Sequence, residues 1–196
     1  MSEKEIVLGF DIGGTKIVTG LISAEGKLLG NRRIENKDTR PEDVLPQMVR
    51  DAEELVRENG FAMKDVRGFG ISAPGPADIA NGILLAPTNN KLWKNVPILQ
   101  YLQEHLGVPG CFENDANCAA LAEGFFGAGR GIDDFIYLTM STGIGAGIVT
   151  GGTLVRGTGY FGGEAGHIVI DVHSDRVCGC GQKGCYEAYC GGRSVA

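Results

Sequence analysis

The residues best suited to hold a metal ion lie together near the end of the sequence. His167 is followed by Cys178, Cys180 and Cys185 in a glycine-rich stretch of this 196-residue chain. Three thiolates and one imidazole form a closed tetrahedral ligand set of the kind that structural zinc sites use. The Cys-x-Cys spacing differs from the Cys-x-x-Cys of redox-active pairs. We therefore favour a zinc site over the two alternatives, a redox pair and buried thiols.

Two carboxylates, Glu164 and Glu187, flank these four predicted ligands. A metal ion that holds the loop between them would also fix both carboxylates in space. The sequence therefore predicts a pinned loop that presents two carboxylates to a binding site.

A second group of residues suited to chemistry lies near the start of the chain, between two apolar runs. Its glycines would let backbone N–H groups turn toward an anion, its threonine and lysine would add donors, and its aspartate could hold a hydrated Mg²⁺ ion. A Walker A loop is excluded, because that motif has the order Gly-Lys-Thr or Gly-Lys-Ser and opens a helix, whereas a strand follows here. The alternative is an ordinary hairpin turn. The residues are Asp11, Gly13, Gly14, Thr15 and Lys16.

The tripeptide Glu113-Asn114-Asp115 precedes an alanine-rich helical pattern. These residues would cap the helix and interact favourably with its dipole. Asp115 would also stand at a strand-to-helix corner, where a carboxylate can accept the proton of an attacking hydroxyl group. The tripeptide by itself leaves both interpretations open.

The elements that must position these residues form two similar sets. The first begins with a three-stranded meander, and the second begins with a strand, a glycine turn and a strand. We predict strands at 6–10, 17–22, 28–34, 66–72, 83–86, 108–112, 135–140 and 148–150, helices at 41–59, 98–106 and 116–126, and a glycine turn at 141–147. The glycine-rich segment 127–133 reads as a boundary, giving a first lobe at 1–126 and a second at 127–196.

A short internal match supports this division. Residues 14–20 (GTKIVTG) and 145–151 (GAGIVTG) agree at five of seven positions. Each segment belongs to a predicted strand–turn–strand unit, so we expect two lobes that each offer a glycine hairpin to a cleft between them.

Composition restricts the partners. The net charge is −6, so we expect neither a nucleic acid nor an anionic membrane surface as a partner. No run approaches the ~18 consecutive apolar residues that span a bilayer. The first ten residues lack the pattern of a signal peptide, which predicts a cytoplasmic protein.

Taken together, four motifs in this order resemble the ROK family of bacterial sugar kinases, such as glucokinases, and sugar-responsive repressors. They are DIGGTK at 11–16, ENDANCAA at 113–120, GEAGH at 163–167 and CGCGQKGCYE at 178–187. The resemblance implies an α/β protein with the actin/hexokinase-like (ribonuclease H-like) ATPase fold and an active site between two lobes. It also implies an incomplete second lobe, since family members continue well beyond the equivalent of residue 196.

The resemblance further implies transfer of the γ-phosphate of ATP, bound with Mg²⁺, to a hexose hydroxyl group. Asp115 would take the hydroxyl proton, and His167 would bind both the structural Zn²⁺ and the sugar. The implied sugar-binding residues are Asn89, Asn114, Asp115, Glu164, His167 and Glu187. The implied nucleotide-binding residues are Asp11, Gly13, Gly14, Thr15 and Lys16, with Thr142 and Gly143 closing from the second lobe.

Two other functions stay open at this point. One is a fragment that binds sugar and zinc without catalysis. The other is a sugar-responsive regulator of the same family that lacks its DNA-binding domain, because only ten residues precede Asp11 and a helix-turn-helix needs more. Glucose is the default sugar, with N-acetylmannosamine, N-acetylglucosamine and fructose as alternatives. Dimers and tetramers are common in the family, which leaves room for a homo-oligomer.

Overall fold

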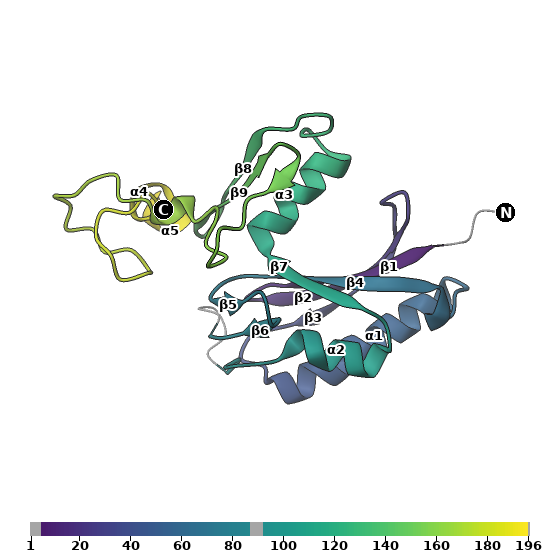
Figure 1. The fold of residues 1–196 in the computed structure, drawn as a ribbon. Helices are drawn as coiled ribbons and strands as arrows, with labels where there is room; N and C mark the ends of the chain where they lie inside the picture. The colour runs from purple at the N-terminus through teal and green to yellow at the C-terminus, as the bar shows by residue number, and fades with distance from the viewer. Residues whose placement is uncertain (1–4, 87–91, 196) are drawn as a thin grey trace. The chain divides into compact units, whose positions relative to one another are not determined.

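The structure, a computed structural model, describes residues 5–86 and 92–195. It divides into two compact units, Met1–Asp115 and Ala116–Ala196, which are described in turn. The predicted division at residues 126/127 differs from this one by the length of a single helix. Figure 1 labels the helices α1–α5 and the strands β1–β9 of the two units.

The first unit is built on a five-stranded sheet with the order β3-β2-β1-β4-β7. Strands β1, β2 and β3 are antiparallel neighbours, which confirms the predicted meander, whereas β1, β4 and β7 run parallel. The carboxyl ends of these three parallel strands therefore meet at one edge of the sheet. The strands are β1 (Ile6–Ile12), β2 (Lys16–Ser23), β3 (Leu28–Glu35), β4 (Val66–Ala73) and β7 (Gly110–Asn114).

Two amphipathic helices cover one face of this sheet. Helix α1 (Pro41–Glu58) contacts β2 and β3, and α2 (Ile98–Leu106) contacts β7 and lies beside α1 (Figure 1). Pro41 opens α1, where its missing N–H costs nothing, and Gly107 ends α2 in the left-handed region with φ 68°. Three short elements complete the unit: η1 (Met63–Asp65), β5 (Ala77–Asp78) and β6 (Ile83–Leu84).

The core of the first unit lies between the sheet and these helices. On β1 the side chains of Ile6, Leu8, Phe10 and Ile12 are buried, while Asp11 between the last two is exposed. This alternation places Val7, Gly9 and Asp11 on the other face of the strand. None of the described helices is long and apolar enough to cross a membrane.

The second unit contains a smaller sheet with the order β10-β9-β8. Its buried apolar cluster is formed by Ala120, Val149 and Leu154, and is far smaller than the core of the first unit. Its elements are α3 (Asp115–Phe126, whose first residue belongs to the first unit), β8 (Phe135–Met140), β9 (Ile144–Thr150), β10 (Thr153–Leu154), η2 (Ala165–His167), α4 (Glu187–Cys190) and α5 (Gly192–Val195).

The glycine turn predicted at 141–147 is wrong in extent. Strand β9 begins at Ile144, so Gly145 and Gly147 lie within the strand. A Cβ atom at Gly147 would lie 2.4 Å from Cβ of Ala120 on α3. The glycine is therefore required because helix α3 packs closely on β9, and no turn is involved.

The repeated strand–turn–strand arrangement is confirmed by the hairpins β1–β2 and β8–β9. The alignment of residues 14–20 with 145–151, suggested by the sequence match, is not confirmed. Gly14 lies in the turn that precedes β2, whereas Gly145 is the second residue of β9. The match therefore joins segments that stand at different positions in their hairpins.

Candidate functional site

The predicted phosphate loop forms the tight connection between β1 and β2. The Gly13 N–H donates to the Lys16 carbonyl over 2.8 Å. Gly13 and Gly14 are half-buried, whereas Thr15 and Lys16 are exposed. The loop is thus a hairpin turn, as one interpretation of the sequence required, and it also exposes the two side-chain donors.

Asp11 lies at the carboxyl end of β1, next to Ser72 on β4. The two residues are paired in the parallel register, and the Ser72 hydroxyl donates to Asp11 Oδ1 over 3.0 Å. The Asp11 carboxylate is exposed and therefore open to a hydrated cation. Ser72 belongs to no motif in the sequence, and only the strand pairing brings it to Asp11.

Asn114 and Asp115 follow the same register one strand further across the sheet. Glu113 pairs with Ser72, so Asp11, Ser72 and Glu113 form one row across β1, β4 and β7. At ~4.8 Å between strands, the row places the end of β7 about 10 Å from Asp11. Glu113 is buried, with Oε1 accepting from the Asn114 N–H over 3.0 Å, and Asp115 is exposed at the start of α3.

The first unit therefore brings together the phosphate loop, Asp11, Asn114 and Asp115 at one edge of its sheet. Ligands of α/β proteins bind at the carboxyl ends of parallel strands. Asn89, the remaining predicted sugar-binding residue of this unit, lies outside the described residues.

In the second unit, Glu187 is tied to the turn that holds Thr142 and Gly143. Its Oε2 accepts from the Ile144 N–H over 2.8 Å. A few residues later, the Gly192 N–H donates to the Ser141 carbonyl over 2.7 Å. The segment after the last cysteine ligand thus holds the β8–β9 turn at both ends.

The four predicted metal ligands come together in the second unit. One ligand atom from each of His167, Cys178, Cys180 and Cys185 lies within 4.8 Å of all the others. Around a tetrahedral zinc ion with bonds of about 2.3 Å to sulfur and 2.0 Å to nitrogen, two sulfurs are about 3.8 Å apart, and a sulfur and a nitrogen about 3.5 Å. The Sγ atoms of Cys180 and Cys185 are 3.8 Å apart, and Cys178 Sγ lies 3.5 Å from His167 Nδ1. The donor set fits zinc.

The His167 ring lies between a cysteine and a carboxylate. Its Nδ1 faces Cys178, while its Nε2 lies 3.8 Å from Glu164 Oε2. In metal-binding histidines one nitrogen binds the metal and the other commonly donates to a carboxylate. Glu164 is the carboxylate near the second nitrogen here, at a distance longer than a hydrogen bond. The structure thus gives Glu164 a protein partner next to the ligand set.

The loop that carries the cysteines is a backbone-bonded turn. The Cys178 N–H donates to the Gln182 carbonyl over 2.8 Å, and the Gly181 N–H donates to the Cys178 carbonyl over 2.9 Å. Burial raises the pKa of the Cys185 thiol to about 12 and also raises the pKa of Cys178. A hydrogen bond from the backbone of Gln182 lowers the pKa of Cys180. A metal ion at this set would therefore displace thiol protons.

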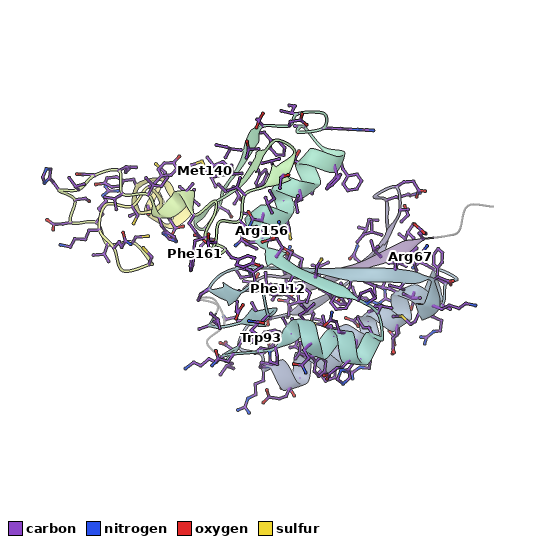
Figure 2. All side chains as sticks on the ribbon, viewed as in Figure 1. Arg67, Trp93, Phe112, Met140, Arg156 and Phe161 are labelled. Atoms are coloured by element: carbon purple, nitrogen blue, oxygen red, sulfur yellow. The ribbon has the colours of Figure 1, made fainter. Side chains whose placement is uncertain are left out.

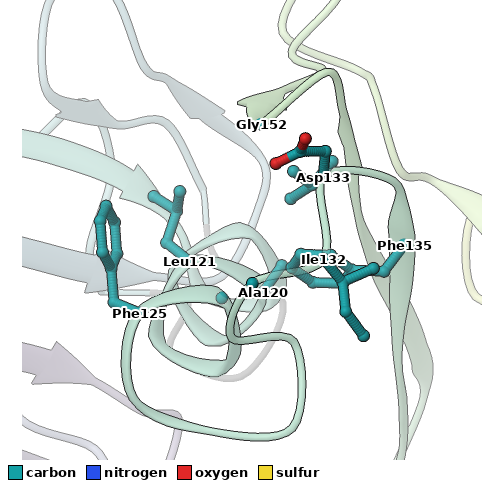
Figure 3. Close-up of a pocket in the computed structure, with 10 residues that line it drawn as sticks. Ala120, Leu121, Phe125, Ile132, Asp133, Phe135 and Gly152 are labelled. Atoms are coloured by element: carbon teal, nitrogen blue, oxygen red, sulfur yellow. The ribbon is translucent and has the colours of Figure 1, made fainter.

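One pocket lies away from all of these residues. It has a volume of about 160 Å³, lies within the second unit and is shown in Figure 3. Its lining is mostly apolar and includes Ala120, Leu121, Phe125, Ile132, Asp133 and Phe135. With Asp133 as the charged group among these, it lacks the convergent polar groups that a sugar needs.

A family model described as the ROK family matches residues 7–196. The chain belongs to the ROK family. Among curated relatives, this ROK chain is 38% identical over 182 residues to a glucokinase of Thermotoga maritima, covering 93% of the chain and 56% of that protein. It is also 34% identical over 191 residues to a xylose repressor of Caldicellulosiruptor bescii, covering 96% of the chain and 47% of that protein.

Solved structures of ROK family proteins also resemble this chain. The ROK hexokinase of Thermus thermophilus superposes with a TM-score of 0.86 at 38% identity, covering 97% of this chain and 61% of that one. A ROK family glucokinase of Streptomyces griseus, solved with glucose and AMPPNP, superposes with a TM-score of 0.78 at 36% identity, covering 97% and 58%. The actin/hexokinase-like fold expected from the sequence is confirmed. The chain spans about half to three-fifths of the length of these relatives.

Proposed function

We propose that this chain carries the sugar- and phosphate-binding part of an ATP-dependent hexose kinase, with Asp115 as the general base. One observation supports this most: the strand register sets the phosphate loop, Asp11, Asn114 and Asp115 at one edge of the sheet. Because glucokinases are among the relatives, we propose a hexose as the substrate, and glucose is the first sugar to test.

In the proposed reaction, a sugar hydroxyl oxygen forms a bond to the γ-phosphorus of ATP as the bond to ADP breaks. Asp115 accepts the hydroxyl proton, and Asn114 beside it hydrogen-bonds the sugar. Mg²⁺ would neutralise negative charge on the phosphates when bound with ATP, and Asp11 is the side chain placed to hold it. The loop Gly13, Gly14, Thr15 and Lys16 would bind the phosphates.

The second unit would contribute the remaining groups. Thr142 and Gly143 would contact the phosphates, and Glu164, His167 and Glu187 would bind sugar hydroxyls, as would Asn89. A sugar hydroxyl is both donor and acceptor, so carboxylates and amides discriminate strongly among sugars. Glu187 already accepts from the Ile144 N–H, so it would join the sugar-binding groups to the phosphate turn.

We further propose that His167, Cys178, Cys180 and Cys185 hold a structural zinc ion. The ligand-atom distances and the Glu164 partner of His167 support this. Metal analysis of protein purified without chelator should give about one equivalent of zinc. Less than half an equivalent would contradict the site.

The kinase proposal is tested by ADP production from Mg²⁺-ATP with a panel of hexoses and N-acetylhexosamines. Asp115→Asn should lower turnover by roughly 10²- to 10⁴-fold with sugar affinity kept, because proton acceptance matters only in the transition state. Glu53→Gln, which removes an exposed carboxylate from α1, is the matched control and should retain activity. Near-normal turnover in Asp115→Asn would refute the base.

A sugar-responsive regulator is the second candidate, because xylose repressors match this chain over nearly its full length. Such a protein binds its sugar without turnover. Calorimetry with glucose and xylose, alongside the ADP assay, separates the two: sugar binding without ADP production or ATP binding favours the regulator or a non-catalytic fragment.

A further inference from the structure

Asn36 is a polar residue buried next to the phosphate loop of the first unit. It directly follows β3 and is 2% exposed. Burial of an amide side chain costs free energy unless its donors and acceptors are hydrogen-bonded. The hydrogen-bond partners of Asn36 therefore indicate its role. Neither the motifs nor the proposed function assigns it a role.

Both of the loop carbonyls that Asn36 contacts are turned toward it. Its side-chain Nδ2 donates to the Gly13 carbonyl over 2.7 Å, and its backbone N–H donates to the Thr15 carbonyl over 2.9 Å. Asn36 therefore holds the loop through two hydrogen bonds, one from its side chain and one from its main chain.

The side-chain bond determines where a loop N–H points. In a trans peptide the C=O and the N–H point in opposite directions. Because Asn36 holds the Gly13 carbonyl, the N–H of Gly14 must point away from the buried amide. Outward-pointing N–H groups in successive turn residues are what make an anion-binding loop.

The orientation of the Asn36 amide is itself fixed. The Thr39 hydroxyl donates to Asn36 Oδ1 over 2.6 Å, which leaves the NH₂ group to face Gly13. The Trp93 indole N–H donates to the Thr39 carbonyl over 3.2 Å, and Trp93 (labelled in Figure 2) is fully buried. Hydrogen bonds therefore connect the core of the unit, through Thr39 and Asn36, to the phosphate loop.

We propose that Asn36 is a positioning residue for phosphate binding, which aims the Gly14 N–H at the phosphate groups of a nucleotide. The identity of the ligand rests on the proposed kinase function, whereas the role of the residue rests on the loop geometry. Asn36 touches no reacting atom in this scheme and acts through Gly13.

The test compares Asn36→Ala, Thr39→Val and Thr39→Ser with the wild-type chain. Calorimetry measures affinity for Mg²⁺-AMPPNP and, separately, for glucose, and amide hydrogen exchange measures protection of residues 11–16. Thr19→Val is the matched control, since it alters another buried polar side chain of the same sheet that does not contact the loop.

We expect Asn36→Ala to weaken AMPPNP binding about tenfold, the effect of one lost hydrogen bond, with glucose affinity unchanged within about twofold. Exchange should accelerate over 11–16. Thr39→Val should also weaken AMPPNP binding and accelerate exchange, but less strongly. Thr39→Ser keeps the hydroxyl and should behave like the wild type. Thr19→Val should change neither the AMPPNP affinity nor the glucose affinity.

Unchanged AMPPNP affinity and loop protection in Asn36→Ala would overturn the proposal, as would equal losses for glucose and AMPPNP. If the wild-type chain binds no AMPPNP, the kinase function fails separately. Exchange then decides the role of Asn36: faster exchange confined to 11–16 supports it, and unchanged exchange overturns it. If Asn36→Ala does not fold, the Thr39→Val and Thr39→Ser pair provides the same comparison.

Discussion

Single buried side chains of this chain differ in how well their polar groups are paired. Asn36 is bonded to the phosphate loop and to Thr39, whereas the hydroxyl of Thr19 on β2 has no hydrogen-bond partner among the described residues. A buried polar group without a partner keeps its full desolvation cost. The hydrogen bonds of Asn36 therefore support the loop next to it, whereas the unpaired hydroxyl of Thr19 lowers the stability of the core.

Thr19→Val should raise the free energy of unfolding by about 1 kcal/mol, because a methyl group replaces the unpaired hydroxyl at nearly the same volume. Urea denaturation measures this. Thr150→Val is the control, since the Thr150 hydroxyl donates to Asp134 Oδ1 over 2.7 Å, and its loss should not stabilise. A destabilised Thr19→Val variant would contradict the prediction.

Two glycines of the cysteine loop allow a matched comparison. Gly181 and Gly184 have φ of 90° and 76°, but only Gly184 is also crowded, with a Cβ position 1.9 Å from the Asp171 carbonyl oxygen. Gly181→Ala should cost roughly 1–2 kcal/mol for the left-handed conformation, and Gly184→Ala clearly more. Thermal unfolding with zinc present measures both. Equal losses would show that the crowding is relieved easily.

At the scale of elements, the loop that carries Cys178, Cys180 and Cys185 buries few apolar side chains, so apolar burial contributes little to its stability. Cys178 and Cys185 are buried, while Ile168, Ile170 and Val177 around them are exposed. Small segments without an apolar core depend on cross-links or metal ions. The proposed zinc ion would therefore supply the folding free energy of this loop.

Removing the proposed zinc ion should loosen this loop and leave the sheet of the first unit intact. Cys185→Ser, or a chelator, should accelerate amide exchange over residues 164–190 with no change over 5–86, because only the loop gains its order from the ligands. Cys111→Ser, which alters an exposed cysteine outside the ligand set, is the control. Identical exchange in Cys185→Ser and wild type would rule out a structural metal.

The β8–β9 hairpin should contribute pH-dependent stability. The Thr150 hydroxyl and the Gly151 N–H donate to Asp134, and these bonds lower the pKa of Asp134 below its ordinary value of 3.8. A lowered folded-state pKa adds stability above the ordinary pKa, and this stability is lost as the pH falls through the lowered value.

Asp134→Asn should therefore lower the Tm at about pH 6, and the difference from wild type should shrink toward about pH 3. Asp133→Asn removes the neighbouring charge without removing these hydrogen bonds, so it should show no such trend. A difference in Tm that stays constant over this range would contradict the assignment.

At the scale of the whole molecule, the two units are unequal in apolar burial. The first has an extensive core, whereas the second exposes Ile136, Leu138 and Met140 along one side of β8, which stands at the edge of its three-stranded sheet among the described strands. An exposed apolar edge strand promotes association between chains.

Ile136→Thr combined with Leu138→Thr should reduce self-association of this chain, measured by sedimentation velocity over a range of concentrations. Both substitutions keep strand-forming residues while removing exposed apolar surface. Leu28→Thr, at an exposed leucine on β3 of the first unit, is the control and should leave association unchanged. Equal association of all variants would show that β8 takes no part in it.

The sequence by itself determined the features that depend on short segments. The family, the three-stranded meander, the boundaries of α2 and the ligand set around His167 follow from local patterns, because turns, helices and metal-ligand spacing are specified within a few tens of residues. The turn at residues 13–15 was also predicted this way, since glycines and donors stand next to one another in the chain, and its binding of phosphate stays a prediction.

Only the tertiary structure decided which distant residues support these segments. Ser72 reaches Asp11 through the parallel pairing of β4 with β1, and Asn36 reaches Gly13 from the end of β3. Residues 144–147 likewise form a strand in place of the predicted turn, and Gly147 allows Ala120 of α3 to pack closely against that strand. Strand register and close packing are set by contacts between segments far apart in the sequence, and no local pattern specifies them.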